Sequence, residues 1–287
     1  MKNFPRYFSI LFVLITAFSC SDNNDDDTGE IIIEPLEFYQ ELNVSYGTDS
    51  DQVFDLYLPA NRTNQTKVII LIHGGGWVSG DKEDMGAFRD YILGQLPDIA
   101  LVNMNYRLSD AVNKPYPMQI NDITSVVDFL KANQEEYVIS DDLGMIGSSA
   151  GAHLSMLWSY AFDTDNQVNM VCSVVGPTNF TDPAYTDSTD PLLQAILNVF
   201  GADATPEYFM DSSPYHRVTA SAPPTIMFYG GQDPLVPTSQ GTDMRDRLEM
   251  LGVTHEFNFY PTEGHGWDGL NLLDTTVKLH AFIEAHL

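Results

Sequence analysis

The chain has 287 residues, with 44% hydrophobic and 18% charged residues, which are the proportions of a globular protein large enough for one α/β domain. Asp and Glu outnumber Lys and Arg by 40 to 13, so the formal net charge is −27. Nucleic acids and anionic membrane surfaces would repel such a chain, and both are therefore excluded as partners of the folded domain.

The N-terminus has the features of an export signal. Lys2 and Arg6 introduce an apolar run, Tyr7 to Phe18, that is too short to span a bilayer as a permanent helix. Cys20 follows almost directly, and the sequence then becomes polar and acidic. This arrangement resembles a bacterial lipoprotein signal, in which the cysteine becomes the lipidated first residue of the mature chain. Phe18 is bulkier than usual for that motif, so ordinary secretion is the alternative.

These features predict a signal peptide over residues 1–19, an acidic tether over 20–35 and a catalytic domain over 36–287. The tether is too polar to bury a core of its own. Its run of Ser, Asp and Asn is similar to the acidic export tag of surface lipoproteins in Bacteroidetes-type bacteria. The resemblance implies a protein anchored to the outer membrane by its N-terminal lipid alone and exposed at the cell surface.

From residue 36 onward, strand-like and helix-like segments alternate along the chain. Apolar runs typical of strands covered on both faces occupy residues 54–59, 67–72, 99–104, 143–147, 169–175, 225–229 and 256–260. Helical spacing of apolar residues appears between Ile120 and Leu130, ahead of Gly252, and from Leu272 to Leu287. The alternation predicts an α/β fold with a mostly parallel central sheet of about eight strands and helices on both faces.

The strand at 67–72 runs into the loop His73-Gly74-Gly75-Gly76-Trp77. Small residues in such a loop let backbone N–H groups approach a reacting oxygen closely. We expect Gly75 and Gly76 to donate hydrogen bonds to an oxyanion, and His73 to anchor the loop by hydrogen bonding. Trp77 either forms a wall of the substrate pocket or packs beneath the loop.

Gly147-Ser148-Ser149-Ala150-Gly151 joins the strand at 143–147 to an apolar helix. The pattern G-x-S-x-G holds a serine hydroxyl on a sharp strand-to-helix turn, and the flanking strand and helix are the context that supports it here. Ser149 is therefore the candidate nucleophile, and the N–H of Ala150 is a third candidate oxyanion donor.

A serine nucleophile needs a base and a group that orients the base. In sheets of this kind the acid and then the histidine follow the serine, each at the carboxyl end of a strand. Asp233 follows the strand at 225–229, and His265 follows the strand at 256–260. We expect Asp233 to orient His265, and His265 to accept the proton of Ser149. Trp267, next to His265, is a second candidate pocket wall, with ordinary packing as the alternative.

The remaining histidines and carboxylates fit other roles. His216 lies in a loop and is the rival base, whereas four histidines in helix or strand surroundings are expected to be structural: His153, His255, His280 and His286. Asp122 is expected on the polar face of its helix. A glycosidase needs a carboxylate pair, and no spacing among the acidic residues selects one. Cys172 lies in an apolar run typical of a buried thiol. No ligand cluster suggests a metal, and no cofactor is expected.

Together these motifs resemble serine esterases of the α/β-hydrolase superfamily that carry HGGG or HGGGW. The resemblance rests on five stretches: His73–Trp77, Asn105–Leu108, Gly147–Gly151, Asp233–Pro237 and Gly264–Gly266. That branch includes hormone-sensitive-lipase-like carboxylesterases and bacterial acetyl-xylan or feruloyl esterases. It implies Ser149 as nucleophile, Asp233 and His265 as its partners, and Gly75, Gly76 and Ala150 as oxyanion donors. The helical cap of the family before HGGG has no evident counterpart, which favours an open cleft without a large cap domain.

The sequence therefore predicts a serine esterase that cleaves short acyl or aromatic acyl groups, with esters of plant polysaccharides as the substrate class. A serine peptidase or amidase on the same fold is one alternative, because the same residues can cleave amides. A non-catalytic carbohydrate-binding lipoprotein that retains the fold is another. The segment 177–223 is expected to form part of the pocket rim.

Overall fold

The computed structural model describes residues 35–201 and 204–287. Residues Pro35–Leu287 form one compact unit. The predicted signal peptide, the lipidation site Cys20 and nearly all of the tether lie outside the described residues. No helix in residues 35–201 and 204–287 combines the length and apolar character needed to cross a membrane.

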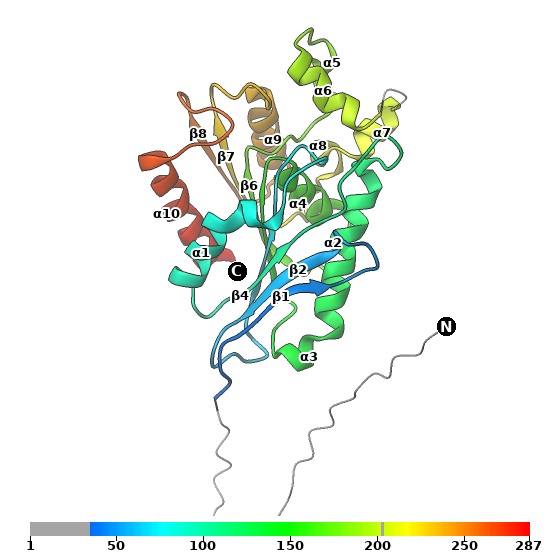
Figure 1. The fold of residues 1–287 in the computed structure, drawn as a ribbon. Coiled ribbons are helices and arrows are strands. Elements are labelled where there is room, and N and C mark those ends of the chain that lie inside the picture. Colours follow the sequence, from blue (N-terminus) through cyan, green and yellow to red (C-terminus); the bar gives the residue numbers. More distant parts are fainter. Residues whose placement is uncertain (1–34, 202–203) are drawn as a thin grey trace, which may run out of the picture. The chain divides into compact units, whose positions relative to one another are not determined.

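The described residues contain an eight-stranded sheet in the order β1-β2-β4-β3-β5-β6-β7-β8 (Figure 1). The strands are β1 (Tyr39–Ser45), β2 (Val53–Leu58), β3 (Val68–Ile72), β4 (Ala100–Met104), β5 (Leu143–Ser148), β6 (Val168–Val174), β7 (Thr225–Gly230) and β8 (His255–Tyr260). The pairs β1–β2 and β2–β4 are antiparallel, whereas every pair from β4 through β8 is parallel. The prediction of about eight mostly parallel strands is confirmed.

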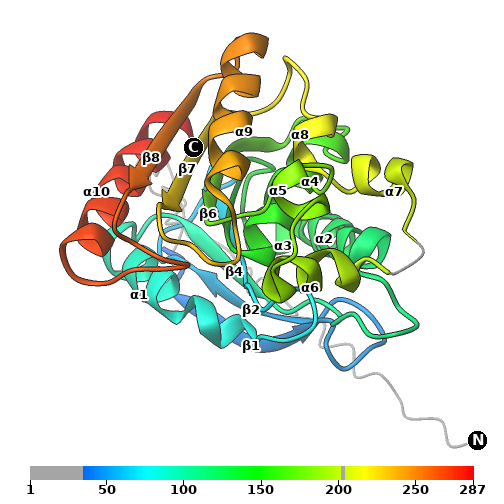
Figure 2. The same ribbon diagram turned by 90° about the horizontal axis from the view of Figure 1, so that it is seen from above.

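Helices cover both faces of this sheet, as predicted (Figure 2). One face packs against α1 (Gly86–Gln95) and α10 (Gly269–His286), which contribute buried residues such as Ile92 and Phe282. The other face packs against α2 (Pro115–Ala132), α4 (Ala150–Ala161) and α9 (Thr238–Leu251). The short helix η1 (Lys82–Met85) precedes α1, and the short helix α3 (Gln134–Tyr137) follows α2. Burial on two faces explains why the central strands are mostly apolar.

The edge strand β1 has no counterpart among the predicted strands. Six of its seven residues are exposed, and the remaining one, Val44, is half-buried. A strand that buries no face lacks the apolar pattern by which the other strands were predicted.

The described part of the connection between β6 and β7 contains four short helices. They are α5 (Pro183–Thr186), α6 (Pro191–Val199), α7 (Pro206–Asp211) and α8 (Pro214–Arg217). Each begins with proline, which suits the first helical position because the missing N–H has no partner there. The side chains of Asp182, Asp190 and Thr205 cap the first three of these helices. This connection lies over the carboxyl ends of the strands and supplies part of the site described next.

Candidate catalytic site

Ser149 lies on the sharp turn between β5 and α4. Its backbone has φ 53° and ψ −118°, a conformation that is strained for a residue other than glycine. A Cβ at Gly151 would lie 2.0 Å from the carbonyl oxygen of Ile72, so only glycine lets α4 approach the end of β3 this closely. The turn therefore presents the serine hydroxyl beside the loop that follows β3.

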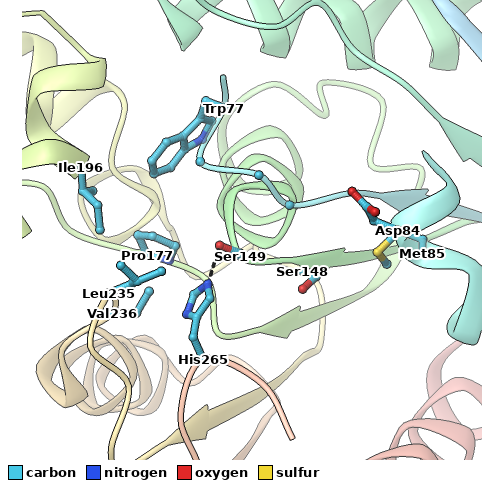
Figure 3. A pocket seen from close by; sticks show the side chains of 13 residues that line it. Trp77, Asp84, Met85, Ser148, Ser149, Pro177, Ile196, Leu235, Val236 and His265 are labelled. Atoms are coloured by element: carbon cyan, nitrogen blue, oxygen red, sulfur yellow. Dashed lines mark hydrogen bonds between the residues drawn. The ribbon is translucent and has the colours of Figure 1, made fainter. Parts of the chain in front are cut away.

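The three predicted residues Ser149, His265 and Asp233 form a hydrogen-bonded chain (Figure 3). Nδ1 of His265 donates to Oδ2 of Asp233 over 2.7 Å, and Nε2 lies 2.8 Å from Oγ of Ser149. The Asp233 side chain is only 1% exposed, whereas that of His265 is 22% exposed. Because the carboxylate holds the proton on Nδ1, Nε2 is left to accept the serine proton.

The loop after β3 carries positive φ at three successive residues: Gly75 at 103°, Gly76 at 58° and Trp77 at 65°. A Cβ at Gly75 would lie 1.9 Å from the carbonyl oxygen of Ser79. A Cβ at Gly74 would lie 3.2 Å from Cβ of Ser149, so the loop passes directly beside the serine. Glycine is therefore required at Gly75 by both its φ and its close contact.

The three predicted oxyanion donors have free N–H groups. No hydrogen bond within the described residues uses the backbone N–H of Gly75, Gly76 or Ala150. Ala150 is also the first residue of α4, where unpaired N–H groups and the helix dipole favour negative charge. The geometry thus leaves donors next to the serine hydroxyl, where an anion would form.

His73 anchors this loop, as predicted. Its Nδ1 donates to the carbonyl of Gly74 over 2.7 Å, and its ring stacks on Tyr106 at 4.2 Å. The hydroxyl of Tyr106 donates to the carbonyls of His73 (3.0 Å) and Gly74 (3.1 Å). Burial lowers the pKa of His73, which favours the neutral form of the ring. The Asn-Tyr-Arg-Leu stretch thus supports the HGGGW loop.

Trp77 both lines the pocket and packs beneath the loop. Its side chain is 1% exposed and contacts Phe180 and Phe200, with ring centroids at 5.8 and 5.0 Å. Its indole N–H donates to Nδ1 of His153 over 3.1 Å, and Nε2 of His153 donates to the carbonyl of Ser212 over 2.7 Å. Burial lowers the pKa of His153 to about 4. His153 is therefore structural, as predicted, and joins α4 to the oxyanion loop.

The expectation that Trp267 could form a pocket wall is wrong. Its indole N–H donates to Oγ1 of Thr275 over 2.8 Å, and its ring packs on Tyr260 at 4.8 Å. It is absent from the residues that line the pocket. Helix α10 begins two residues after Trp267 and holds the indole against the outer layer, which is the alternative of ordinary packing.

The rival base His216 bonds instead to Oγ1 of Thr181, over 2.8 Å. The hydrogen bond that a base must make to Ser149 is made by His265.

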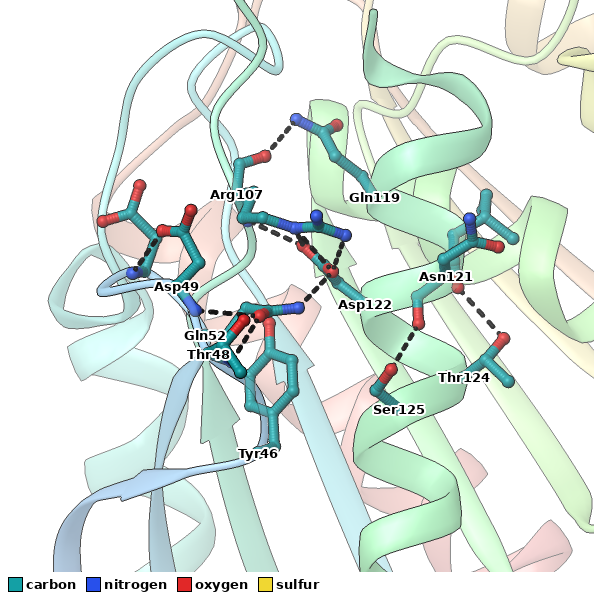
Figure 4. A network of polar contacts seen from close by, with 12 residues as sticks. Tyr46, Thr48, Asp49, Gln52, Arg107, Gln119, Asn121, Asp122, Thr124 and Ser125 are labelled. Atoms are coloured by element: carbon teal, nitrogen blue, oxygen red, sulfur yellow. Dashed lines mark hydrogen bonds and ion pairs between the residues drawn. The ribbon is translucent and has the colours of Figure 1, made fainter. Parts of the chain in front are cut away.

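Asp122 is buried, which corrects its expected place on a polar helix face. The side chain has no exposed surface and accepts from Nη2 of Arg107 at 2.6 Å and from Nε2 of Gln52 at 2.9 Å (Figure 4). On the same helix, Nε2 of Gln119 donates to the carbonyls of Trp77 (2.8 Å) and Arg107 (2.9 Å). The sequence analysis did not identify Gln52 or Gln119, and it did not pair Asp122 with Arg107, although Arg107 is a cation that needs a partner.

The pocket above Ser149 has a volume of about 390 Å³ and two unlike sides (Figure 3). One side is apolar and carries Trp77, Pro177, Ile196, Leu235 and Val236. The other carries Asp84 and Met85, at the end of η1. The predicted rim segment 177–223 thus contributes Pro177 and Ile196.

Within the described residues, no group of three or more His, Cys, Asp or Glu side chains is arranged to hold a metal ion. Cys172 is free and buried, and burial raises the pKa of its thiol, as expected for a structural cysteine.

Comparison with known proteins agrees with this geometry. The family model BD-FAE matches residues 54–248. The chain is 26% identical over 254 residues to Esterase LipC of Mycobacterium tuberculosis, an alignment that covers 83% of this chain and 62% of LipC. It is 28% identical over 202 residues to the probable carboxylic ester hydrolase LipM of the same organism, covering 66% of this chain and 46% of LipM. The chain thus spans about half the length of these relatives, or somewhat more.

Two solved structures share the fold. A truncated carbohydrate esterase from gut microbiota superposes with a TM-score of 0.71 at 21% identity, covering 85% of this chain and 95% of that one. An acetyl ester-xyloside bifunctional hydrolase from Caldicellulosiruptor lactoaceticus superposes with a TM-score of 0.68 at 19% identity. The match covers 81% of this chain and 88% of that one. At these low sequence identities, the similarity shows only that the folds are alike.

Proposed function

The chain belongs to the BD-FAE family, with the α/β-hydrolase fold, and we propose that it is a serine carboxylic-ester hydrolase. The observation that carries the proposal is the chain of hydrogen bonds from Asp233 through His265 to Ser149, at the floor of a pocket. A serine hydroxyl is a weak nucleophile at neutral pH unless an adjacent base removes its proton. The geometry provides that base, already oriented.

In the proposed reaction, Oγ of Ser149 attacks the ester carbonyl carbon while Nε2 of His265 takes the serine proton. The carbonyl oxygen becomes negative and accepts hydrogen bonds from the N–H groups of Gly75, Gly76 and Ala150. Donors fixed in advance stabilise this charge only when it forms, and each is worth on the order of 3 kcal/mol of the barrier. Asp233 stabilises the imidazolium ion.

The tetrahedral intermediate then collapses, and His265 gives its proton to the departing alcohol oxygen. The acyl group remains on Ser149. A water molecule loses a proton to His265 and attacks the acyl carbon, and collapse of the second intermediate releases the carboxylic acid and restores the serine O–H.

The apolar side of the pocket is suited to bind the acyl part of the substrate, either a short acyl group or a single aromatic acyl group. Its volume lies near the lower end of the range of small-molecule sites, roughly 300–1,000 Å³. The two structural neighbours, a carbohydrate esterase and an acetyl ester-xyloside hydrolase, support an acylated plant polysaccharide or its fragments as the substrate class.

The test is release of 4-nitrophenol from 4-nitrophenyl acetate by residues 21–287. We expect Ser149→Ala to abolish the catalysed rate and Ser125→Ala, on the far side of α2, to retain it. Equal rates from Ser149→Ala and the unchanged protein would refute the assignment. A fluorophosphonate probe should label Ser149, whereas a carbohydrate-binding protein without catalysis would stay unlabelled. Acetylated xylan and feruloylated arabinoxylan then separate acetyl from aromatic acyl substrates.

We further propose that Cys20 carries a lipid that anchors the protein to the outer membrane. Support comes from the sequence around it, with the apolar run before the cysteine and the acidic run after it. Expression in a bacterial host with radiolabelled palmitate should label the unchanged protein and not Cys20→Ala. Release of unlabelled protein into the soluble fraction would instead indicate ordinary secretion.

A further inference from the structure

Asp84 is the one acidic residue among the thirteen that line the pocket, and His265 is the only other ionisable one. The Asp84 side chain lies across the pocket from Ile196 and Leu235, on the side that also carries Met85 (Figure 3). An ester likewise has two unlike parts, an acyl group and an alcohol.

The charge of Asp84 is not neutralised. Oδ2 accepts from the backbone N–H of Asp81 over 3.0 Å, in the cap of η1, and Asp84 forms no ion pair with any described residue. The nearby cations form ion pairs with other carboxylates. Lys82 pairs with the buried Asp55 at 3.1 Å, and Arg89 pairs with Glu83 and Asp90, both at 2.9 Å.

The cap of η1, where a carboxylate also suits the helix dipole, engages only one oxygen of Asp84. Oδ2 accepts from Asp81, and no hydrogen bond among the described residues uses Oδ1. The Asp84 side chain is exposed and lines the pocket, so Oδ1 is open to a hydroxyl group of a bound substrate.

We propose that Asp84 is a specificity-determining residue that accepts hydrogen bonds from hydroxyl groups of the alcohol part of the ester and repels anionic alcohols. This inference rests on the proposed esterase function. The acyl group lies against the apolar side, and the alcohol lies toward Asp84 and Met85. The alcohol that fits is an uncharged polyol such as a sugar, whose hydroxyls donate hydrogen bonds to the carboxylate.

The first experiment compares kcat/KM for methyl 4-acetoxybenzoate and 4-acetoxybenzoate, whose leaving groups differ by one negative charge. We expect the unchanged protein to prefer the neutral ester, and Asp84→Asn to reduce that preference about threefold to tenfold at low salt. The intrinsic reactivities of the two esters cancel when preferences are compared between variants. Asp98→Asn removes the same charge from an exposed position outside the pocket and should leave the preference unchanged.

The second experiment compares an acetylated methyl β-xyloside with 4-nitrophenyl acetate. We expect Asp84→Ala to lower kcat/KM for the sugar ester about tenfold relative to the aryl ester. Asp81→Ala also breaks the cap of η1, yet it lies outside the pocket and should not change this ratio.

The outcomes separate the two proposals. If Ser149→Ala is inactive but the Asp84 variants change neither ratio, the role of Asp84 is wrong and the esterase proposal stands. If Asp81→Ala changes the sugar-to-aryl ratio as much as Asp84→Ala does, capping alone explains Asp84. If Ser149→Ala retains full activity, the esterase proposal itself fails.

Discussion

At the scale of single residues, Asp233 uses its two carboxylate oxygens for two different purposes. Oδ2 accepts from His265, while Oδ1 accepts from the N–H groups of Leu235 (2.8 Å) and Val236 (2.9 Å). Leu235 and Val236 also line the apolar side of the pocket. One buried carboxylate thus orients the base and shapes the loop that receives the acyl group.

Asp233→Asn separates these two purposes. The amide oxygen can still accept from the loop, so we expect the thermal midpoint to change little. The amide N–H₂ facing His265 cannot accept the Nδ1 proton, so the imidazole loses its productive tautomer and kcat should fall about 10³- to 10⁴-fold. Hydrolysis of 4-nitrophenyl acetate and thermal unfolding measure the two effects. A loss of activity below tenfold would contradict the orienting role.

His153 predicts a pH dependence of stability. Its pKa in the folded protein is about 4, below the ordinary histidine value near 6.5, because burial disfavours the charged ring. The unfolded chain therefore binds the proton first as pH falls. The contribution to the free energy of unfolding is present above pH ~6.5 and is lost as pH falls toward ~4, by about 1.4 kcal/mol per pH unit at most.

The matched variant is His153→Gln, whose amide can accept from Trp77 and donate to Ser212 without titrating. Urea unfolding of both proteins between pH 7 and pH 4 should show the unchanged protein losing on the order of 3 kcal/mol more than the variant. Parallel stability curves for the two would show that His153 is not held neutral.

At the scale of elements, helix α2 supports the oxyanion loop from behind. The carbonyl of Trp77, a residue strained at φ 65°, accepts from the N–H (2.8 Å) and Oγ (3.0 Å) of Ser109 and from Nε2 of Gln119 (2.8 Å). A strained backbone persists only where its surroundings determine it fully. These three donors hold the Trp77 end of the loop, whereas His73 and Tyr106 hold its other end.

Gln119→Met should therefore lower kcat about tenfold with little change in KM, because substrate binding stays and oxyanion binding loosens. The control is Gln52→Met, which removes a similar amide from the same polar network without touching Trp77. We expect both variants to lose about 1–3 kcal/mol of stability. If Gln52→Met lowers kcat as much as Gln119→Met does, the effect comes from general destabilisation and not from the loop.

At the scale of the whole molecule, the chain has 40 acidic and 13 basic residues, a net charge of −27. Repulsion among the acidic residues destabilises the folded state. Exposed like charges are screened by salt over about 10 Å at 0.1 M. We expect the thermal midpoint at pH 7 to rise by several degrees between 10 and 300 mM NaCl. A sucrose control of equal osmolarity separates screening from solute exclusion. A flat or falling midpoint in NaCl would show that ion pairs already offset the repulsion.

The sequence alone determined the strands buried on both faces, the serine turn, the glycine loop and the order Ser149, Asp233, His265. These are local features, because burial sets an apolar run and close backbone approach demands glycine within a few residues. Only the tertiary structure decided that Trp267 packs outside the pocket, that Asp122 is buried under Arg107, and that Asp84 lines the pocket. Each of these depends on which element covers which face, through contacts between residues far apart in the chain. A pattern along one helix or loop carries no information about what lies opposite it.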